Sequence, residues 1–266
     1  MSLLVIDWDY FFPVPHDNAS DMIHFYDWGH SEHWGPGVMS ALWITRAAQF
    51  IQHDRPLPTV NDGWKGWWDR FAIDPEAHLV YANSNVNAIV GDDRGLLDPL
   101  DFDEVWLYDQ HHDSGYGRTP KNLAEWERVT CEDWLIYFTA AGVDTHVRYP
   151  AWHTLWETVE PTPDVEPTTR CVDEGNDDLL PVFSQVMVCR SDAWVPPWCD
   201  QDFQAFIEAC PVIESTCVDD TADEPRAWDV EDAIEHAKVW IELRNLHKAV
   251  TTGTVDVDTT DDRLAP

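Results

Sequence analysis

The chain has 266 residues, of which 44% are hydrophobic, and its formal net charge at pH 7 is −34. The length suits one large α/β domain with a substantial core, and the apolar content with 16 tryptophans excludes a disordered chain. Such acidity excludes nucleic acid and anionic membranes as expected partners and favours a cationic small-molecule or peptide substrate. Arginines outnumber lysines by 12 to 4, so the acid excess indicates either a high-salt cytoplasm or a GC-rich genome.

The N-terminus has no basic start and no long apolar run before Asp7, so we expect no signal peptide. No stretch approaches the length of a transmembrane helix, and the six cysteines include no CxxC pair. These features predict a cytoplasmic protein with reduced thiols, and they leave its oligomeric state open.

Residues 3–12 read as a buried β-strand that ends in two carboxylates spaced by two, Asp7 and Asp9. In a parallel sheet the carboxyl ends of the strands meet at one edge, where open α/β sheets hold their ligands. A long, turn-rich segment over residues 13–37 then leaves this edge and carries His30, Glu32 and His33. These three are candidate ligands or substrate contacts, and local capping and packing is the alternative.

Helices and strands alternate in the next part of the chain. Apolar residues at helical spacing predict a helix over residues 36–51. A tryptophan-rich segment at 63–71 is expected to pack on the core, with a cation–π contact to a guanidinium as the alternative. Residues 79–85 read as a strand that ends in amides.

The most informative pattern follows an apolar run at 105–108 and consists of Asp109, His111 and Asp113. If the chain is still extended there, alternate side chains share one face and can converge on one point. Hard carboxylates with one imidazole suit a divalent ion such as Mn²⁺ and lack the thiolates that structural zinc prefers. With Asp7 and Asp9 they predict a site for one or two ions, and a polar turn after a buried strand is the alternative.

The rest of the chain continues the alternation. The expected elements are a helix after a capping box at Thr130, a strand over 145–149, a surface loop over 157–178, a strand over 182–189, a helix capped by Asp200 and an amphipathic helix over 229–250. This order predicts an α/β fold of three layers, a mainly parallel sheet with helices on both faces. The predicted domains are a catalytic domain over 1–217, an acidic linker and C-terminal helix packed on it over 218–250, and a flexible tail over 251–266.

The segment from Asp109 to Asp113 resembles the D-x-H-x-D signature of the arginase/deacetylase superfamily, and Asp7-Trp8-Asp9 looks like its other metal strand. The likeness is closest to the branch that contains the peptide arginases. There the signature is followed by an Asn/Asp-Trp pair and a YP-x-W phrase, as in 133–134 and 149–152 here. Two features depart from the family. The two metal strands come in the opposite order, and an upstream metal-binding partner is not recognisable at 83–85.

The resemblance implies an arginase-like fold and a binuclear Mn²⁺ site. Asp109 would bridge the two ions, His111 and Asp113 would each hold one, and Asp7 and Asp9 would complete the pair. A water shared by two cations has a lowered pKa and can attack an electrophilic carbon, which the hydrolysis of a guanidinium requires.

A catalytic proton shuttle to the departing amine is expected from His112 or His30. The sequence thus predicts a metal-dependent hydrolase of C–N bonds, an amidinohydrolase acting on guanidino groups that include peptidyl arginine.

Three alternatives remain. A deacetylase of the same superfamily uses the same activated water, although paired histidines and a catalytic tyrosine loop are not recognisable. A phosphatase of the haloacid-dehalogenase type would use Asp7 as its nucleophile, but it leaves Asp109, His111 and Asp113 unexplained. An acidic, non-enzymatic interaction protein needs the charge alone and would bind no metal.

Overall fold

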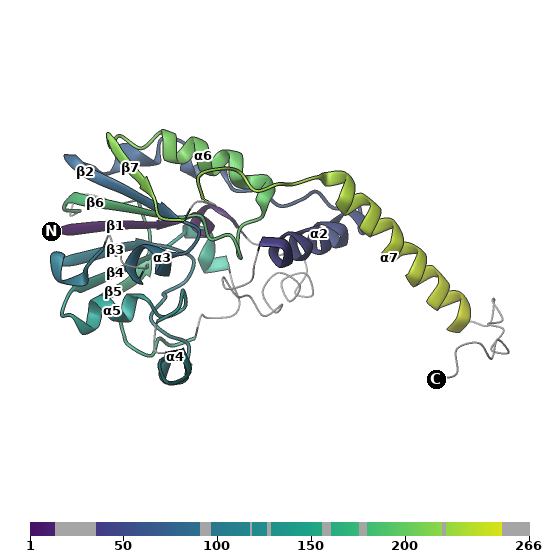
Figure 1. Ribbon diagram of the computed structural model, residues 1–266, viewed down its shortest axis with the longest axis horizontal. Coiled ribbons are helices and arrows are strands. Elements are labelled where there is room, and N and C mark those ends of the chain that lie inside the picture. The colour runs from purple at the N-terminus through teal and green to yellow at the C-terminus, as the bar shows by residue number, and fades with distance from the viewer. Residues whose placement is uncertain are drawn as a thin grey trace. The chain divides into compact units, whose positions relative to one another are not determined.

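Seven parallel strands form one sheet in the order β5-β4-β3-β1-β6-β2-β7 (Figure 1). Figure 1 shows the computed structural model, which describes residues 1–13, 36–90, 97–117, 119–126, 129–155, 161–175, 180–219 and 222–251. The strands are β1 (Ser2–Asp7), β2 (Ala72–Ala82), β3 (Glu104–Tyr108), β4 (Asp144–Tyr149), β5 (Thr169–Val172), β6 (Val182–Cys189) and β7 (Glu214–Cys217). All of their pairings are parallel, which confirms the predicted parallel α/β sheet.

The described helices alternate with these strands. The α-helices are α2 (Pro36–Gln52), α3 (Asn85–Val90), α4 (Thr119–Trp126), α5 (Leu135–Ala140), α6 (Asp200–Glu208) and α7 (Val230–Thr251). Short 3-10 helices are η1 (Trp8–Phe11), η2 (Asp62–Trp64), η3 (Trp67–Arg70), η4 (Pro99–Asp101), η5 (Ala151–Leu155) and η6 (Pro197–Cys199). Among the described residues, no helix has both the length and the apolar content that crossing a membrane requires.

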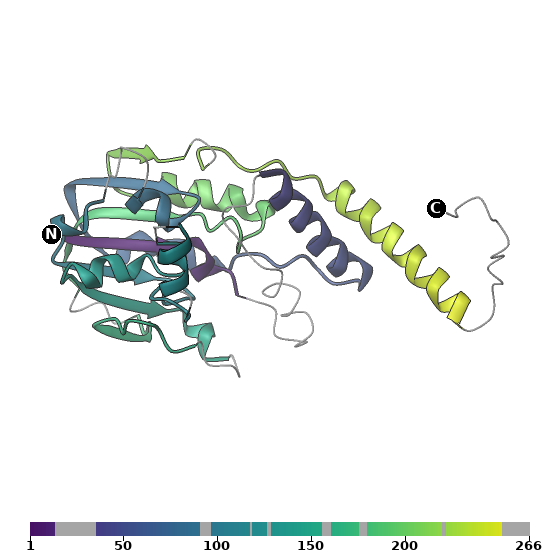
Figure 2. The ribbon, with the colours of Figure 1, turned by 60° about the horizontal axis from the view of Figure 1, so that its bottom comes forward.

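Strand β1 lies in the middle of the sheet, between β3 and β6 (Figure 2, purple). Leu3, Leu4, Val5 and Ile6 are each fully buried. A strand covered on both faces needs apolar side chains at consecutive positions, which explains the unbroken apolar run.

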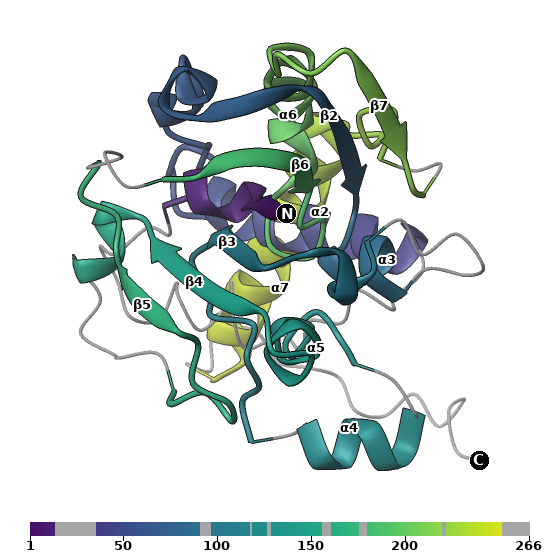
Figure 3. The ribbon, with the colours of Figure 1, turned by 90° about the vertical axis from the view of Figure 1, so that its left-hand side faces the viewer.

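Layers of different composition cover the two faces of the sheet. Figure 3 shows α3 and α5 on one side and α6 on the other. On the side of α5, Leu135 and Phe138 join a mainly aliphatic core with the inward residues of β1, β3 and β4. On the opposite side, aromatic rings from η1 and η3 meet α6, as where Trp68 stacks on Phe206 with centroids 4.6 Å apart. The predicted three-layer arrangement and the packing of the tryptophan-rich segment on the core are confirmed.

Two strands lie where no strand was predicted from the sequence. β5 falls inside residues 157–178, which were expected to form a surface loop, and β7 was not expected at all. Both are edge strands of four residues with no fully buried position. An edge strand needs no continuous apolar run, so the pattern that reveals central strands is missing here.

The chain divides into two compact units, Met1–Trp34 with Pro58–Ala227, and Gly35–Leu57 with Trp228–Pro266. The first contains the whole sheet. In the second, α2 packs against α7, and Ala233 and Ala237 of α7 are buried, as the amphipathic pattern predicts. The domain boundaries expected from the sequence, 1–217, 218–250 and 251–266, stay a prediction.

Candidate metal centre

The two acidic motifs leave neighbouring strands at the same level of the sheet. Ile6 of β1 pairs with Tyr108 of β3, so Asp7 and Asp109 follow directly at the carboxyl edge. The expectation that both motifs finish at one edge is therefore confirmed.

Turns, rather than extended chain, bring the motif side chains together. β1 ends at Asp7, whose carboxylate accepts a hydrogen bond from the amide of Asp9 at 3.0 Å and so caps η1. β3 ends at Tyr108, and Asp109 accepts a hydrogen bond from the amide of His111 at 2.8 Å. The predicted strand-like alternation is wrong here, because each first aspartate folds the chain back by binding the amide two residues later.

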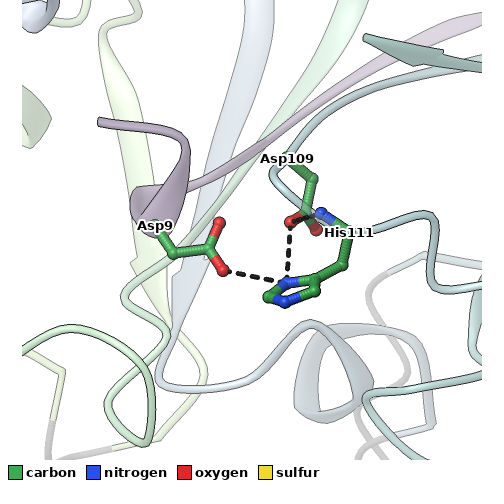
Figure 4. A group of neighbouring side chains, drawn as sticks. All are labelled: Asp9, Asp109 and His111. Atoms are coloured by element: carbon green, nitrogen blue, oxygen red, sulfur yellow. Dashed lines mark hydrogen bonds and ion pairs between the residues drawn. The ribbon is translucent and has the colours of Figure 1, made fainter. Parts of the chain in front are cut away.

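Asp9, Asp109 and His111 form a compact group that could hold a metal ion (Figure 4). One ligand atom from each residue lies within 4.8 Å of the others. The Nδ1 atom of His111 is 3.1 Å from Asp9 Oδ2 and 3.5 Å from Asp109 Oδ1. Both carboxylates are buried, whereas 19% of the His111 side chain is exposed, so the group has a buried floor and an open side.

A cavity of about 150 Å³ is lined by Asp9, Asp109 and His111. The two remaining predicted ligands, Asp7 and Asp113, line this cavity as well. Its other lining residues are Asn85, Tyr116, Cys131, Glu132, Ser191 and Trp194. All five predicted metal residues therefore line one cavity. Among the described residues, the group whose ligand atoms all lie within 4.8 Å of one another consists of Asp9, Asp109 and His111.

Asp113 is fixed in an unusual backbone conformation. Its φ of 47° lies in the left-handed region, and Ser191, which also lines the cavity, has a φ of 55°. Non-glycine residues in this region are costly and concentrate at functional sites. The indole Nε1 of buried Trp134 donates to Asp113 Oδ2 at 2.6 Å, and the amide of Leu135 donates to its backbone carbonyl at 3.1 Å.

Comparison of the chain with protein-family models, curated proteins and solved structures finds no match.

The cavity is short of positive charge. Five carboxylates and one imidazole line it. Burial and the charges of the neighbouring carboxylates raise the pKa of both Asp7 and Asp109 well above its ordinary value. Burial also opposes ionisation of Asp9, but the charge and hydrogen bonds of His111 outweigh it and lower the pKa of Asp9.

The pKa of His111 depends on two opposing effects, burial and the neighbouring carboxylates. Burial favours its neutral form, yet the charge of Asp9 and the hydrogen bonds with Asp109 and Asp9 raise its pKa well above 6.5. A divalent cation would relieve the repulsion between the carboxylates and compete with the proton for the imidazole. Two carboxylates with one imidazole are a donor set that fits such a cation.

Of the two predicted catalytic histidines, His112 lies in the described part of the chain. His112 is fully buried, and its Nε2 lies 2.9 Å from the carbonyl of Pro161. Its Nδ1 accepts a hydrogen bond from the amide of Ser114 at 3.0 Å, and its ring stacks on Tyr116. His112 does not line the cavity, and a catalytic role for it stays a prediction. His30, with Glu32 and His33, lies outside the described residues.

Sequence reasoning missed the neutral residues of the site. Asn85, Ser191 and Trp194 line the cavity, and each follows a strand whose end carries no repeated acidic pattern. The position of Asn85 three residues after the end of β2 was the available signal, since the strand over residues 79–85 was predicted to end in amides. Trp134 belongs to the Asp-Trp pair that supported the family resemblance, and its bond to Asp113 gives that pair a physical role.

Proposed function

We propose that the chain is a metal-dependent hydrolase of C–N bonds, an arginase-like amidinohydrolase that acts on guanidino groups. The observation that carries this proposal is the convergence of Asp9, Asp109 and His111 with Asp7 and Asp113 on one cavity at the carboxyl edge of the sheet. The arginase/deacetylase resemblance requires these two motifs to meet, and they lie about a hundred residues apart in the chain.

The residues of the cavity supply the parts of such a reaction. A divalent cation held by Asp9, Asp109 and His111 would supply an activated water as the nucleophile. The carboxylates of Asp9 and Asp109 are buried, so bulk water is excluded from the floor of the site. Burial also holds their oxygen atoms in place before substrate binds.

The wall of the cavity favours a cationic substrate. Glu132 adds a carboxylate to the lining, and the ring of Trp194 lies 4.9 Å from that of His111. A planar guanidinium can pair with a carboxylate and stack on an aromatic ring. We therefore favour free or peptidyl arginine over an acetylated amine, which carries no charge at the reacting group.

The test is release of urea and conversion of arginine to ornithine, measured with added Mn²⁺ on free arginine and on a panel of arginine-containing peptides. Asp109→Asn is the inactive control, and removal of metal by a chelator should abolish turnover. Acetyl-lysine peptides and p-nitrophenyl phosphate form the other arms. Turnover of either of these, with none on guanidino substrates, would overturn the proposal.

A further inference from the structure

Gln110 lies between two members of the candidate metal group, Asp109 and His111, but does not itself line the cavity. Only 1% of this residue is exposed. The hydrogen bond from the amide of His111 to the carboxylate of Asp109 closes a turn around it. A buried side-chain amide needs hydrogen-bond partners inside the protein, so the partners of Gln110 indicate its role.

Gln110 holds both carboxylate oxygens of Asp9. Its Nε2 donates to Asp9 Oδ2 at 2.8 Å, and its backbone amide donates to Asp9 Oδ1 at 3.3 Å. Asp9 belongs to the other acidic motif, 101 residues earlier in the chain, and is fully buried. Because rotation of this carboxylate would break these bonds, Gln110 fixes the orientation of a side chain that another strand supplies.

The oxygen that the Gln110 side chain holds also faces the imidazole. Asp9 Oδ2 lies 3.1 Å from His111 Nδ1. The charge of Asp9 acts against ionisation of Asp109 and raises its pKa, so these two carboxylates repel each other. A donor that holds Asp9 therefore opposes a repulsion that would otherwise separate the ligand atoms.

We infer that Gln110 is a positioning residue for the metal centre. It orients Asp9 toward Asp109 and His111, so that the donor atoms of the two motifs are in place before an ion binds. The inference rests on the proposed function, because both place a metal ion at these three side chains. It does not depend on how many ions the cavity holds.

The neutral charge of Gln110 fits this role. A lysine or an arginine would also hold the carboxylate of Asp9, but its positive charge would compete with the metal ion. A side-chain amide donates hydrogen bonds without carrying a charge. Gln110 therefore restrains Asp9 and leaves its negative charge available to the ion.

The Mn²⁺ affinity of the full chain, measured by titration calorimetry, tests this role. Gln110→Met has nearly the same size but no donor, so Asp9 loses the side-chain bond at 2.8 Å. Mn²⁺ should bind about 10- to 100-fold more weakly, which is the usual loss when a residue that holds a metal ligand is replaced. With guanidino substrates, the Mn²⁺ concentration that gives the half-maximal rate should rise, while kcat at saturating Mn²⁺ stays near that of the unsubstituted protein.

Two further variants complete the design, and urea denaturation of the metal-free proteins establishes that each variant is folded. Gln110→Asn keeps the amide but is one methylene shorter, so it should weaken Mn²⁺ binding in the same direction. It decides the question if Gln110→Met does not fold. Gln204→Met is the matched control, since Gln204 donates to the carbonyl of Ala222 at 2.9 Å and does not line the cavity. This control should bind Mn²⁺ normally.

Unchanged Mn²⁺ affinity in the folded Gln110 variants would overturn the inference, and so would an equal loss of affinity in Gln204→Met. Binding of Mn²⁺ without turnover of guanidino substrates would overturn the proposed function and leave the role of Gln110 intact. Failure of the unsubstituted protein to bind any divalent cation would overturn both.

Discussion

Nδ1 of His111 is shared between two carboxylates, Asp9 at 3.1 Å and Asp109 at 3.5 Å. A proton on this nitrogen would lie near both acids and offset part of their charge. A metal ion bound by the same three side chains takes over the role of the proton. Single substitutions among them should therefore affect metal binding more than folding.

Asp109→Asn should weaken the binding of Mn²⁺ by Asp9, Asp109 and His111 by more than the 10- to 100-fold that is usual for residues outside the ligand set. The cause is the loss of a charged ligand from a buried position. Titration calorimetry measures this, with Asp101→Asn as the control because Asp101 is exposed on η4. Equal affinity in the two variants would contradict the assignment.

Trp134→Phe should keep the aromatic packing and remove the donor to Asp113. We expect a loss of about 1–3 kcal/mol in the free energy of unfolding, because a buried carboxylate oxygen loses its partner. Urea denaturation measures the change. Trp106→Phe is the matched control, since its indole donates to the partly exposed Glu104 and water can replace that bond. A smaller loss for Trp134→Phe than for Trp106→Phe would contradict this view.

The charged part of the site was predictable from the sequence, because aspartates and a histidine spaced by two after a buried strand are typical of metal ligands. The neutral part was not. Asn85 and Ser191 each occur singly at a strand end, where asparagine and serine also serve ordinary turns. The burial that makes them informative comes from β6 pairing with β1 and β2 pairing with β6, an arrangement that depends on the sheet order.

At the scale of elements, the segment after β6 is fastened by a buried ion-pair cluster. Arg226 binds the fully buried Asp200 through its backbone amide and its guanidinium, at 2.6–2.8 Å. The same guanidinium donates to the carbonyls of Asp192 and Val195 at 2.7 and 2.8 Å. This cluster holds the stretch that carries Ser191 and Trp194 to the cavity.

Arg226→Met should cost about 3–5 kcal/mol in the free energy of unfolding, because it leaves Asp200 buried with Arg190 as a weaker partner at 3.5 Å. Chemical denaturation checks this. Arg170→Met is the control, since its pair with the exposed Glu166 should contribute less than about 1 kcal/mol. Similar losses in both variants would show that the cluster adds no special stability.

A second ion pair ties the end of β5 to η3. Arg70 donates to both carboxylate oxygens of Asp173 at 2.8 and 3.0 Å, and its guanidinium lies 4.1 Å from the centre of the Trp67 ring. Burial would raise the pKa of Asp173, but the hydrogen bonds from Arg70 and from the hydroxyl of Tyr10 outweigh it and lower the pKa.

Because the folded pKa of Asp173 is lowered, its contribution to stability is present at neutral pH and is lost as the pH falls through the folded value. Asp173→Asn should therefore lower the free energy of unfolding at pH 7 and flatten its decline below pH 4. Urea titrations across this range measure both effects. An unchanged decline would mean that other carboxylates dominate acid unfolding.

The same elements show where prediction of the fold succeeded. Central strands β1, β3 and β6 carry continuous apolar runs because both of their faces are covered, and the sequence reveals them. Edge strands β5 and β7 are polar and short, so their pairing follows from the sheet already present and not from their own composition. The 3-10 turn at Asp9 depends on one side-chain cap, a signal too local for periodicity to detect.

For the whole molecule, the net charge of −34 is the dominant property. Like charges at this density repel one another, and salt shortens the range of repulsion from about 10 Å at 0.1 M to about 3 Å at 1 M. The expectation that nucleic acid is not a partner stays a prediction, and it depends on this charge alone.

The melting temperature should therefore rise as NaCl increases at pH 7. Scanning calorimetry at several salt concentrations measures this, with sorbitol of equal osmolality as the uncharged control. A rise with salt but little with sorbitol assigns the effect to screening. A melting temperature that does not change with NaCl would show that the acidic groups are spaced widely enough not to destabilise the fold.

Strand β1 has a consequence for how the protein is made. Leu3 pairs with Val105 on one side and with Gln185 on the other, so β1 needs partners that are synthesised about 100 and 180 residues after it. Until they arrive, its four apolar side chains have no sheet to enter. We expect slow assembly of the sheet, during which chaperone binding to the unpaired β1 segment governs the yield of folded protein.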